Sequence, residues 1–178
     1  MGILEKFKNP FNWISGDIAI DLGTANTLVY IKGKGVMINE PSIVAKSVHD
    51  NKIIAVGYDA KAMVGRTHRE IETVRPLRDG VIADFNMTDG LLQGFINKIN
   101  INRLSRPRMV ICVPSGVTEV ERRAVRDSGE RANAREVFLI EEPVAAAIGI
   151  GIDISKAIGN IIIDIGGGTT EIAVIALN

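Results

Sequence analysis

The chain has 178 residues, of which 46% are hydrophobic and 24% are charged, a composition typical of soluble globular proteins. Its 21 basic and 21 acidic residues give a formal net charge of +0, which argues against a nucleic-acid partner, since that needs a basic surplus. The single cysteine, Cys112, excludes an internal disulfide, and its place in an apolar run predicts a buried structural thiol. No apolar stretch reaches the ~20 residues of a membrane-spanning helix, and no signal-peptide core is present. The expected location is the cytoplasm.

The first segment, residues 1–15, differs from the rest in composition. Its apolar residues fall largely on one helical face beside two lysines, and Pro10 limits the length of such a helix. A short basic and apolar helix with a tryptophan suits the headgroup region of a membrane. The segment is therefore either a membrane-surface anchor or a terminus that is disordered or docked on the core. The candidate membrane contacts are Ile3, Leu4, Phe7, Phe11 and Trp13.

Strand-like and helix-like patterns alternate along the remaining chain. Two β-rich runs, 17–22 and 27–32, are separated by a few small or polar residues and predict a hairpin. Residues 34–75 mix short strands, turns and a short helix, and we expect an inserted α/β subdomain there. The elements expected beyond it are helices over 87–97, 118–132 and 143–148, and buried strands over 109–113 and 137–140. This order predicts an α/β fold whose sheet contains parallel strands and is flanked by helices.

An internal repeat is the strongest functional signal. Residues 17–23 align without a gap with residues 160–166, which places Asp21 over Asp164. In both copies a strand ends in Asp, a tight turn containing Gly or Thr follows, and a second apolar strand returns. Two matched copies predict duplicated lobes that face one another across a cleft.

The residue types in the two turns favour phosphate binding. Glycines allow a sharp turn and a close approach to a ligand, and successive turn amides can donate to phosphate oxygens. Asp21 and Asp164 would repel phosphates unless a divalent cation lay between them, and Mg²⁺ fits because it needs few direct protein ligands. The candidate nucleotide-binding residues are Asp21, Gly23, Thr24, Ala25, Asn26 and Thr27, and Gly166, Gly167, Gly168, Thr169 and Thr170.

Two adjacent glutamates, Glu141 and Glu142, precede Pro143 and an alanine-rich helix. A carboxylate there can favour the helix dipole as a cap, and this role is favoured for Glu141. It can also orient a water toward a γ-phosphate. The residues alone do not decide which of the two glutamates does so.

These motifs resemble those of the actin, chaperone-ATPase and sugar-kinase superfamily, in the form typical of the MreB family of bacterial actins. Residues 21–27 and 164–171 are similar to its two phosphate motifs, residues 140–143 to its connecting motif, and residues 75–84 to a further family segment. The resemblance runs from about Ser15 to Asn178. It implies an actin-like fold, with a first subdomain over 16–33 and 76–150, the insertion over 34–75, and the start of a second lobe over 151–178.

The resemblance also implies roles for single residues. Asp21 and Asp164 would hold Mg²⁺ largely through water, and the two turns would contact the phosphates of ATP from opposite sides. Glu142 would orient the attacking water, helped by Thr169. In the family, ATP binding drives polymerisation, and the filaments lie on the inner face of the cell membrane and guide the cell-wall elongation machinery. An N-terminal amphipathic helix is one of its membrane anchors.

Three functions remain open from the sequence, and the first is an ATP-binding filament protein whose hydrolysis is impaired. Because the family's base pocket lies in the part of the second lobe beyond Asn178, we expect the ATPase of this chain to be impaired, and the choice of ATP over GTP is open. A sugar-type kinase of the same fold is a second reading, and a non-catalytic scaffold fragment is a third. The hairpin 160–177 is also expected to expose apolar strand edges.

Overall fold

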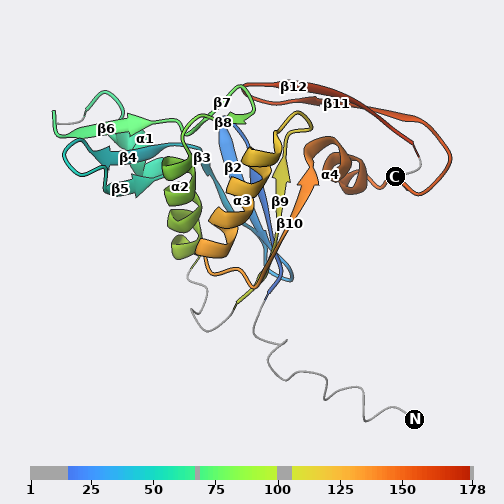
Figure 1. Cartoon of the computed structure of the whole chain (residues 1–178), viewed down its shortest axis with the longest axis horizontal. Helices are drawn as coiled ribbons and strands as arrows, with labels where there is room; N and C mark the ends of the chain where they lie inside the picture. Colours follow the sequence, from blue (N-terminus) through green and yellow to red (C-terminus); the bar gives the residue numbers. More distant parts are fainter. Residues whose placement is uncertain (1–15, 67–68, 100–105, 177–178) are drawn as a thin grey trace, which may run out of the picture.

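The computed structural model (Figure 1) describes residues 16–66, 69–99 and 106–176. The candidate membrane contacts of the first 15 residues lie outside the described residues, so that prediction stays a prediction.

A mixed five-stranded sheet is the centre of the molecule, with strand order β10-β9-β1-β2-β3. The expected first hairpin is present, because β1 (Ile18–Leu22) and β2 (Asn26–Ile31) pair antiparallel. On the far side of β2 lies the antiparallel β3 (Gly35–Pro41). On the other side of β1 lie the parallel strands β9 (Arg108–Val113) and β10 (Glu136–Glu141). The predicted α/β class, with parallel members in the sheet, is confirmed.

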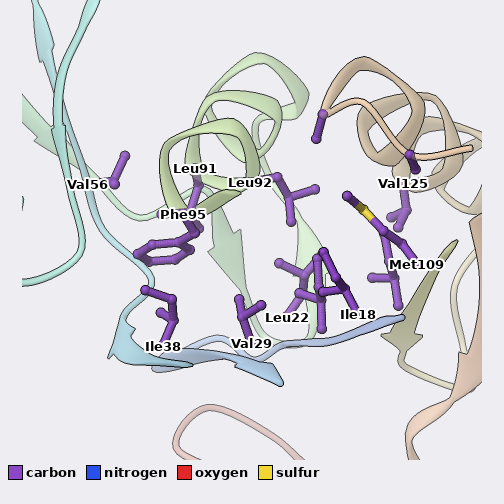
Figure 2. Packing of buried hydrophobic residues seen from close by; sticks show 14 of the residues in the cluster. Ile18, Leu22, Val29, Ile38, Val56, Leu91, Leu92, Phe95, Met109 and Val125 are labelled. Atoms are coloured by element: carbon purple, nitrogen blue, oxygen red, sulfur yellow. The ribbon is translucent and has the colours of Figure 1, made fainter. Parts of the chain in front are cut away.

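The main hydrophobic core lies between this sheet and two helices, α2 (Phe85–Lys98) and α3 (Glu119–Arg131). Residues 18, 20 and 22 of β1 alternate onto the core face and are at most 6% exposed. Figure 2 shows the side chains of Leu91, Leu92 and Phe95 reaching from α2 toward the sheet. Each such buried apolar side chain contributes roughly 1.5–3 kcal/mol to the stability of the folded state. Asp21, by the same alternation, lies on the opposite face of the sheet.

The predicted helix boundaries agree closely with the structure. Helix α2 begins after Asp84, whose Oδ1 accepts a hydrogen bond of 3.0 Å from the backbone N–H of Met87. Helix α3 begins with the expected capping box, in which the Thr118 hydroxyl oxygen accepts from the Glu121 N–H and the Glu121 carboxylate accepts from the Thr118 N–H. Asn133 follows this helix with a φ of 73°, the left-handed conformation predicted for it.

A smaller antiparallel sheet lies beside the main one (Figure 1) and contains β4 (Val44–Ser47), β5 (Ile53–Val56) and β6 (Ile71–Val74), with α1 (Tyr58–Met63) packed on it. The sequence assigned all of residues 34–75 to the insertion. Strand β3 instead pairs with β2 in the main sheet, and its Ile38 is buried in the main core. The division of the chain with an inserted subdomain over residues 34–75 stays a prediction.

A second hairpin extends from the other end of the molecule (Figure 1). Helix α4 (Glu142–Gly149) leads toward β11 (Asn160–Ile165), which pairs antiparallel with β12 (Thr170–Ile175). One face of this second hairpin packs on α4 through Ala147, Ile162 and Ile175. The side chains of the opposite face are 60–76% exposed, namely Ile161, Ile163, Ile165, Ile172 and Val174. Within the described ranges, no helix has the length and apolar character needed to cross a bilayer.

Candidate functional site

The two repeated turns line one cavity of about 310 Å³, a size within the range of small-ligand pockets. It lies where the first hairpin, α4 and the second hairpin meet. The sequence had selected many of its lining residues: Asp21, Gly23, Thr24, Ala25, Asn26, Glu142, Asp164, Gly166, Gly167, Gly168 and Thr169. The remaining ones are Cys112, Ala145, Ala146 and Glu171.

Strand alternation explains why both aspartates reach this cavity. Asp21 lies between the core-facing residues Ile20 and Leu22, so its side chain points away from the core. Asp164 shares its face of β11 with Ile162, which packs on α4. The two carboxylates therefore approach the cavity from different sheets.

The two turns contact each other directly. A Cβ placed on Gly167 would lie 2.5 Å from the Cβ of Ala25, and one placed on Gly168 would lie 2.6 Å from Cγ2 of Thr24. These are distances at which a neighbouring group must move. Glycine at these positions is required by the close approach of the two turns.

Thr27, a predicted phosphate contact, does not line the cavity. Its side chain is fully buried (0% exposed), and its Oγ1 lies 2.9 Å from Oγ of Ser42. Because Ser42 donates its own proton to the carbonyl oxygen of Gly23 at 2.6 Å, Thr27 must donate to Ser42. Thr27 thus supports the first turn from beneath. Thr170 is exposed and is not among the lining residues either.

A third turn joins the two phosphate-type turns. It connects β7 (Leu77–Arg78) and β8 (Val81–Ile82) and lies in the segment 75–84. The backbone N–H of Gly80 donates to Oγ1 of Thr24 at 3.1 Å. A Cβ on Gly80 would also lie 2.9 Å from the methyl group of Thr169. Gly80, with a φ of 75°, therefore lies against both turns.

The electrostatics of the cavity are dominated by carboxylates. Burial raises the pKa of Glu142 to about 7, with further contributions from the negative charges of Asp21, Glu171 and Asp164. Burial, and then the charge of Asp164, also raises the pKa of Asp21. Among the described residues, no Lys or Arg lines the cavity. The site therefore favours a ligand that brings positive charge with it.

Cys112 departs from its predicted role as a buried structural thiol. It is half-buried and lines the cavity, on the same face of the sheet as its cross-strand neighbour Asp21. Burial and the charges of Asp21 and Glu142 raise the pKa of its thiol to about 12, so the thiol is neutral and unreactive at physiological pH.

The structure separates the two adjacent glutamates. Glu142 lines the cavity, with Pro143 in the first turn of α4 as predicted. Glu141 occupies the N-cap position, yet its side chain makes no capping hydrogen bond. Its Oε1 instead accepts a hydrogen bond of 3.0 Å from Nη2 of Arg122 on α3. Glu141 thus lies at the N-terminus of α4, where its charge was predicted to favour the helix dipole, but its side chain accepts no capping hydrogen bond there.

The lining residues fit a magnesium ion that keeps most of its own water. Mg²⁺ prefers hard oxygen ligands such as carboxylates, and Asp21 and Asp164 supply one carboxylate group each. Across the parts of the chain that the structure describes, no group of three or more acidic, His or Cys side chains is arranged as a metal site. Water and ligand phosphates would therefore have to complete the coordination.

Glu171 is a charged lining residue that the sequence reasoning did not select. It is directly paired with Asp164 across the second hairpin, so both side chains lie on one face. A four-residue turn over 166–169 implies this pairing, and the signal was available in the sequence. Cys112 gave no such signal, since its neighbour Asp21 belongs to a strand about 90 residues away.

Comparison with known proteins identifies the family of the chain. A family model described as "MreB/Mbl protein" matches residues 15–178. The chain is 54% identical to the "Cell shape-determining protein MreB" of Escherichia coli over 99% of its own length and 52% of that protein. It is 52% identical to "Cell shape-determining protein Mbl" of Bacillus subtilis over 90% of its own length and 49% of that protein. The chain thus spans about half the length of the curated relatives that it matches.

Solved structures give the same result for the fold. The crystal structure of MreB5 of Spiroplasma citri bound to ADP matches with a TM-score of 0.80 and 43% identity, covering 91% of this chain and 49% of that one. The same protein bound to AMPPNP matches with a TM-score of 0.79 and 44% identity, at the same coverage. A MamK double helical filament matches with a TM-score of 0.75 at 22% identity, covering 92% of this chain and 50% of that one, which supports the fold alone. The fold is actin-like, and the chain belongs to the MreB/Mbl family.

Proposed function

We propose that the chain binds ATP together with Mg²⁺ in the cavity between the turns 23–26 and 166–169. One observation carries this proposal: an Asp near the end of each of two strands, and the tight turn that follows each strand, line the same cavity. The cavity gathers four carboxylates and, among the described residues, no cationic side chain. A magnesium–phosphate ligand would supply the missing positive charge and accept hydrogen bonds from the turns.

The residues of the chain divide into three roles in this proposal. Backbone amides of both turns, with the hydroxyl groups of Thr24 and Thr169, donate to phosphate oxygens. Asp21 and Asp164 hold Mg²⁺ through its water ligands, and the ion would neutralise phosphate charge when bound. Glu142, at the start of α4, orients a water for attack on the terminal phosphate. At its raised pKa it would also accept a proton near neutral pH.

An adenine nucleotide is favoured by the solved relatives. The Spiroplasma citri structures contain ADP and AMPPNP and share 43% and 44% identity with this chain. At the level of the whole protein, we propose a cytoplasmic, cell-shape-determining filament protein. It would polymerise with copies of itself, lie on the inner face of the cell membrane through residues 1–15, and guide the cell-wall elongation machinery.

Calorimetric titration with Mg-ATP tests the proposal. We expect micromolar binding to the folded chain and a loss of at least about tenfold in affinity for Asp164→Ala, since the mutation removes a metal-holding charge. Asp50→Ala is the matched control, because Asp50 is exposed in a turn away from the cavity. A folded, monodisperse chain that binds no Mg-ATP would refute the proposal.

Three further arms sharpen the result. Titration with Mg-GTP compares the two bases, and titration of ATP with a chelator present measures the dependence on Mg²⁺. Phosphate release in the same samples distinguishes a chain that hydrolyses ATP from a scaffold that only binds it.

A further inference from the structure

Glu171 is the one carboxylate of the cavity for which the proposed chemistry has no use. It lies directly opposite Asp164 on the same face of the second hairpin. Like charges directly opposite each other destabilise an antiparallel pair. A glutamate at this position therefore needs a compensating interaction.

Ser115 provides such an interaction from outside the second hairpin. It lies in the loop between β9 and α3, and its Oγ donates a hydrogen bond of 3.3 Å to Oε2 of Glu171. Among the described residues, this is the only hydrogen bond between the second hairpin, residues 160–175, and the body formed by residues 16–149. Within the described part of the chain, the side chains of Asp21, Glu142 and Asp164 make no such hydrogen bond between the hairpin and the body.

The second hairpin contacts the rest of the chain at three places. Near its open end, Ile162 and Ile175 pack on Ala147 of α4. At its tip, the turn 166–169 lies against the turn 23–26 and Gly80. Beside that turn, the contact is the hydrogen bond between Ser115 and Glu171. The pairing register places Asp164 directly beside this hydrogen bond. Without this hydrogen bond, only van der Waals contacts would hold the turn end of the hairpin, and an isolated two-stranded sheet is only marginally stable by itself.

We propose that Glu171 is a positioning residue of the ATP site, which acts through the Ser115 hydrogen bond to hold the second hairpin and Asp164 against the cavity. This inference rests on the proposed function. The hydrogen bond connects the second hairpin, at the position paired with Asp164, to the loop between β9 and α3. Breaking it lets the turn 166–169 move away from the turn 23–26 and shortens the lifetime of bound nucleotide.

Four variants separate this role from a role of charge alone. Ser115→Ala removes the donor and keeps the carboxylate. Glu171→Gln removes the charge and keeps an oxygen that accepts from Ser115. Glu171→Ala removes both, and the double variant Ser115→Ala/Glu171→Ala closes the cycle. Ser155→Ala is the matched control, because its hydroxyl also donates to a carboxylate, that of Asp153, within a local turn outside the cavity.

The first measurement is the dissociation rate of a fluorescent ATP analogue with Mg²⁺. Ser115→Ala and Glu171→Ala should each raise it on the order of 3- to 10-fold, as expected for one hydrogen bond to a charged group that is partly exposed. The double variant should equal either single variant, and Glu171→Gln should stay within about twofold of the wild type. A Glu171→Gln rate as high as that of Glu171→Ala would overturn the inference, because charge would then be the cause.

The second measurement is hydrogen exchange at the amides of the second hairpin without nucleotide. Ser115→Ala should raise exchange in β11 and β12 and leave α2 unchanged. If the wild type binds no Mg-ATP, the proposed function fails, and this arm still tests the tether by itself. Wild-type exchange in Ser115→Ala overturns the inference, whatever the nucleotide result.

Discussion

Glu142 is the residue whose environment most alters its ordinary chemistry. Its pKa of about 7, against 4.5 for a free glutamate, means that the folded chain binds this proton more tightly than the unfolded chain. Between about pH 4.5 and 7, the contribution of this group to stability therefore rises as the pH falls. Above pH 7 the ionised form carries its full penalty, which solvent screening of a half-buried group limits to about 1–2 kcal/mol.

The change Glu142→Gln should therefore stabilise the nucleotide-free chain in a pH-dependent way. We expect the free energy of unfolding to rise by about 1–2 kcal/mol at pH 8 and by less than about 1 kcal/mol at pH 5, measured by urea denaturation. The control Glu141→Gln should lower it by up to about 1 kcal/mol, because it weakens a partly exposed ion pair with Arg122. An equal gain at both pH values for Glu142→Gln would contradict the burial of its charge.

Thr27 allows a direct choice between a ligand role and a structural role. The near-isosteric change Thr27→Val removes the hydrogen bond to Ser42 and leaves a buried hydroxyl group short of a partner. We expect a loss of about 1–3 kcal/mol in unfolding free energy, with only a few-fold loss in Mg-ATP affinity. The exposed Thr170 gives the control Thr170→Val, which should change neither quantity. Intact stability with lost binding in Thr27→Val would restore the phosphate contact predicted from the sequence.

At the scale of elements, the smaller sheet packs against helix α2. A Cβ on Gly94 would lie 2.7 and 2.8 Å from the two methyl groups of Val56 in β5. At the end of α2, Lys98 pairs at 2.8 Å with both Glu40 of β3 and Asp59 of α1. A close helix–strand contact and a three-residue charge cluster thus fix the smaller sheet.

The change Gly94→Ala should weaken the packing of the smaller sheet on α2. Alanine gains up to about 1 kcal/mol in helix propensity, but its methyl group meets a stiff β-branched side chain, at a cost of about 1–3 kcal/mol. We expect a net loss in unfolding free energy, measured by urea denaturation. Gly149→Ala in α4 is the control, since nothing lies within 4 Å of its added Cβ, and it should stabilise the chain slightly. Equal stability of the two variants would contradict the tight packing at Gly94.

Local patterns predicted most elements, and non-local pairing explains what they missed. The alternating apolar residues 18, 20 and 22 predict a strand from neighbouring residues alone. The capping box at Thr118 predicts the start of a helix in the same way. Strand β3 has exposed Val36 and Met37 beside the polar Asn39, a pattern with little strand character. Only pairing with β2 and burial of Ile38 make it part of the main sheet, and the sequence does not state that pairing.

For the candidate site too, the sequence predicted what depends on neighbouring residues and missed what depends on non-local contacts. The repeat identified both turns, because a strand, an Asp and a glycine turn are contiguous in sequence. It did not show that Thr27 points toward the core face, since that direction depends on the register of β2. Nor could it bring Gly80 and Ser115 to the turns, because their contacts join residues 56 positions apart in sequence.

At the scale of the whole molecule, the cavity lies between a part of the chain with a large hydrophobic core and a part with a small one. The five-stranded sheet with α2 and α3 has a continuous core. The second hairpin has only a small apolar cluster and one face with large exposed side chains. The cavity therefore lies at the boundary between a rigid part and a weakly held part, where ligand binding can change the relative position of the two.

The four carboxylates of the cavity have a consequence for the response of the chain to ionic strength. With a formal net charge of +0, the molecule has no overall repulsion for salt to screen. The repulsion is local to Asp21, Glu142, Asp164 and Glu171, and the screening length falls from about 30 Å at 0.01 M to about 3 Å at 1 M salt. Added sodium chloride should thus weaken the electrostatic repulsion among these four carboxylates, as bound Mg-ATP would do. A chelating buffer of low ionic strength is the medium in which the empty cavity opposes folding most strongly.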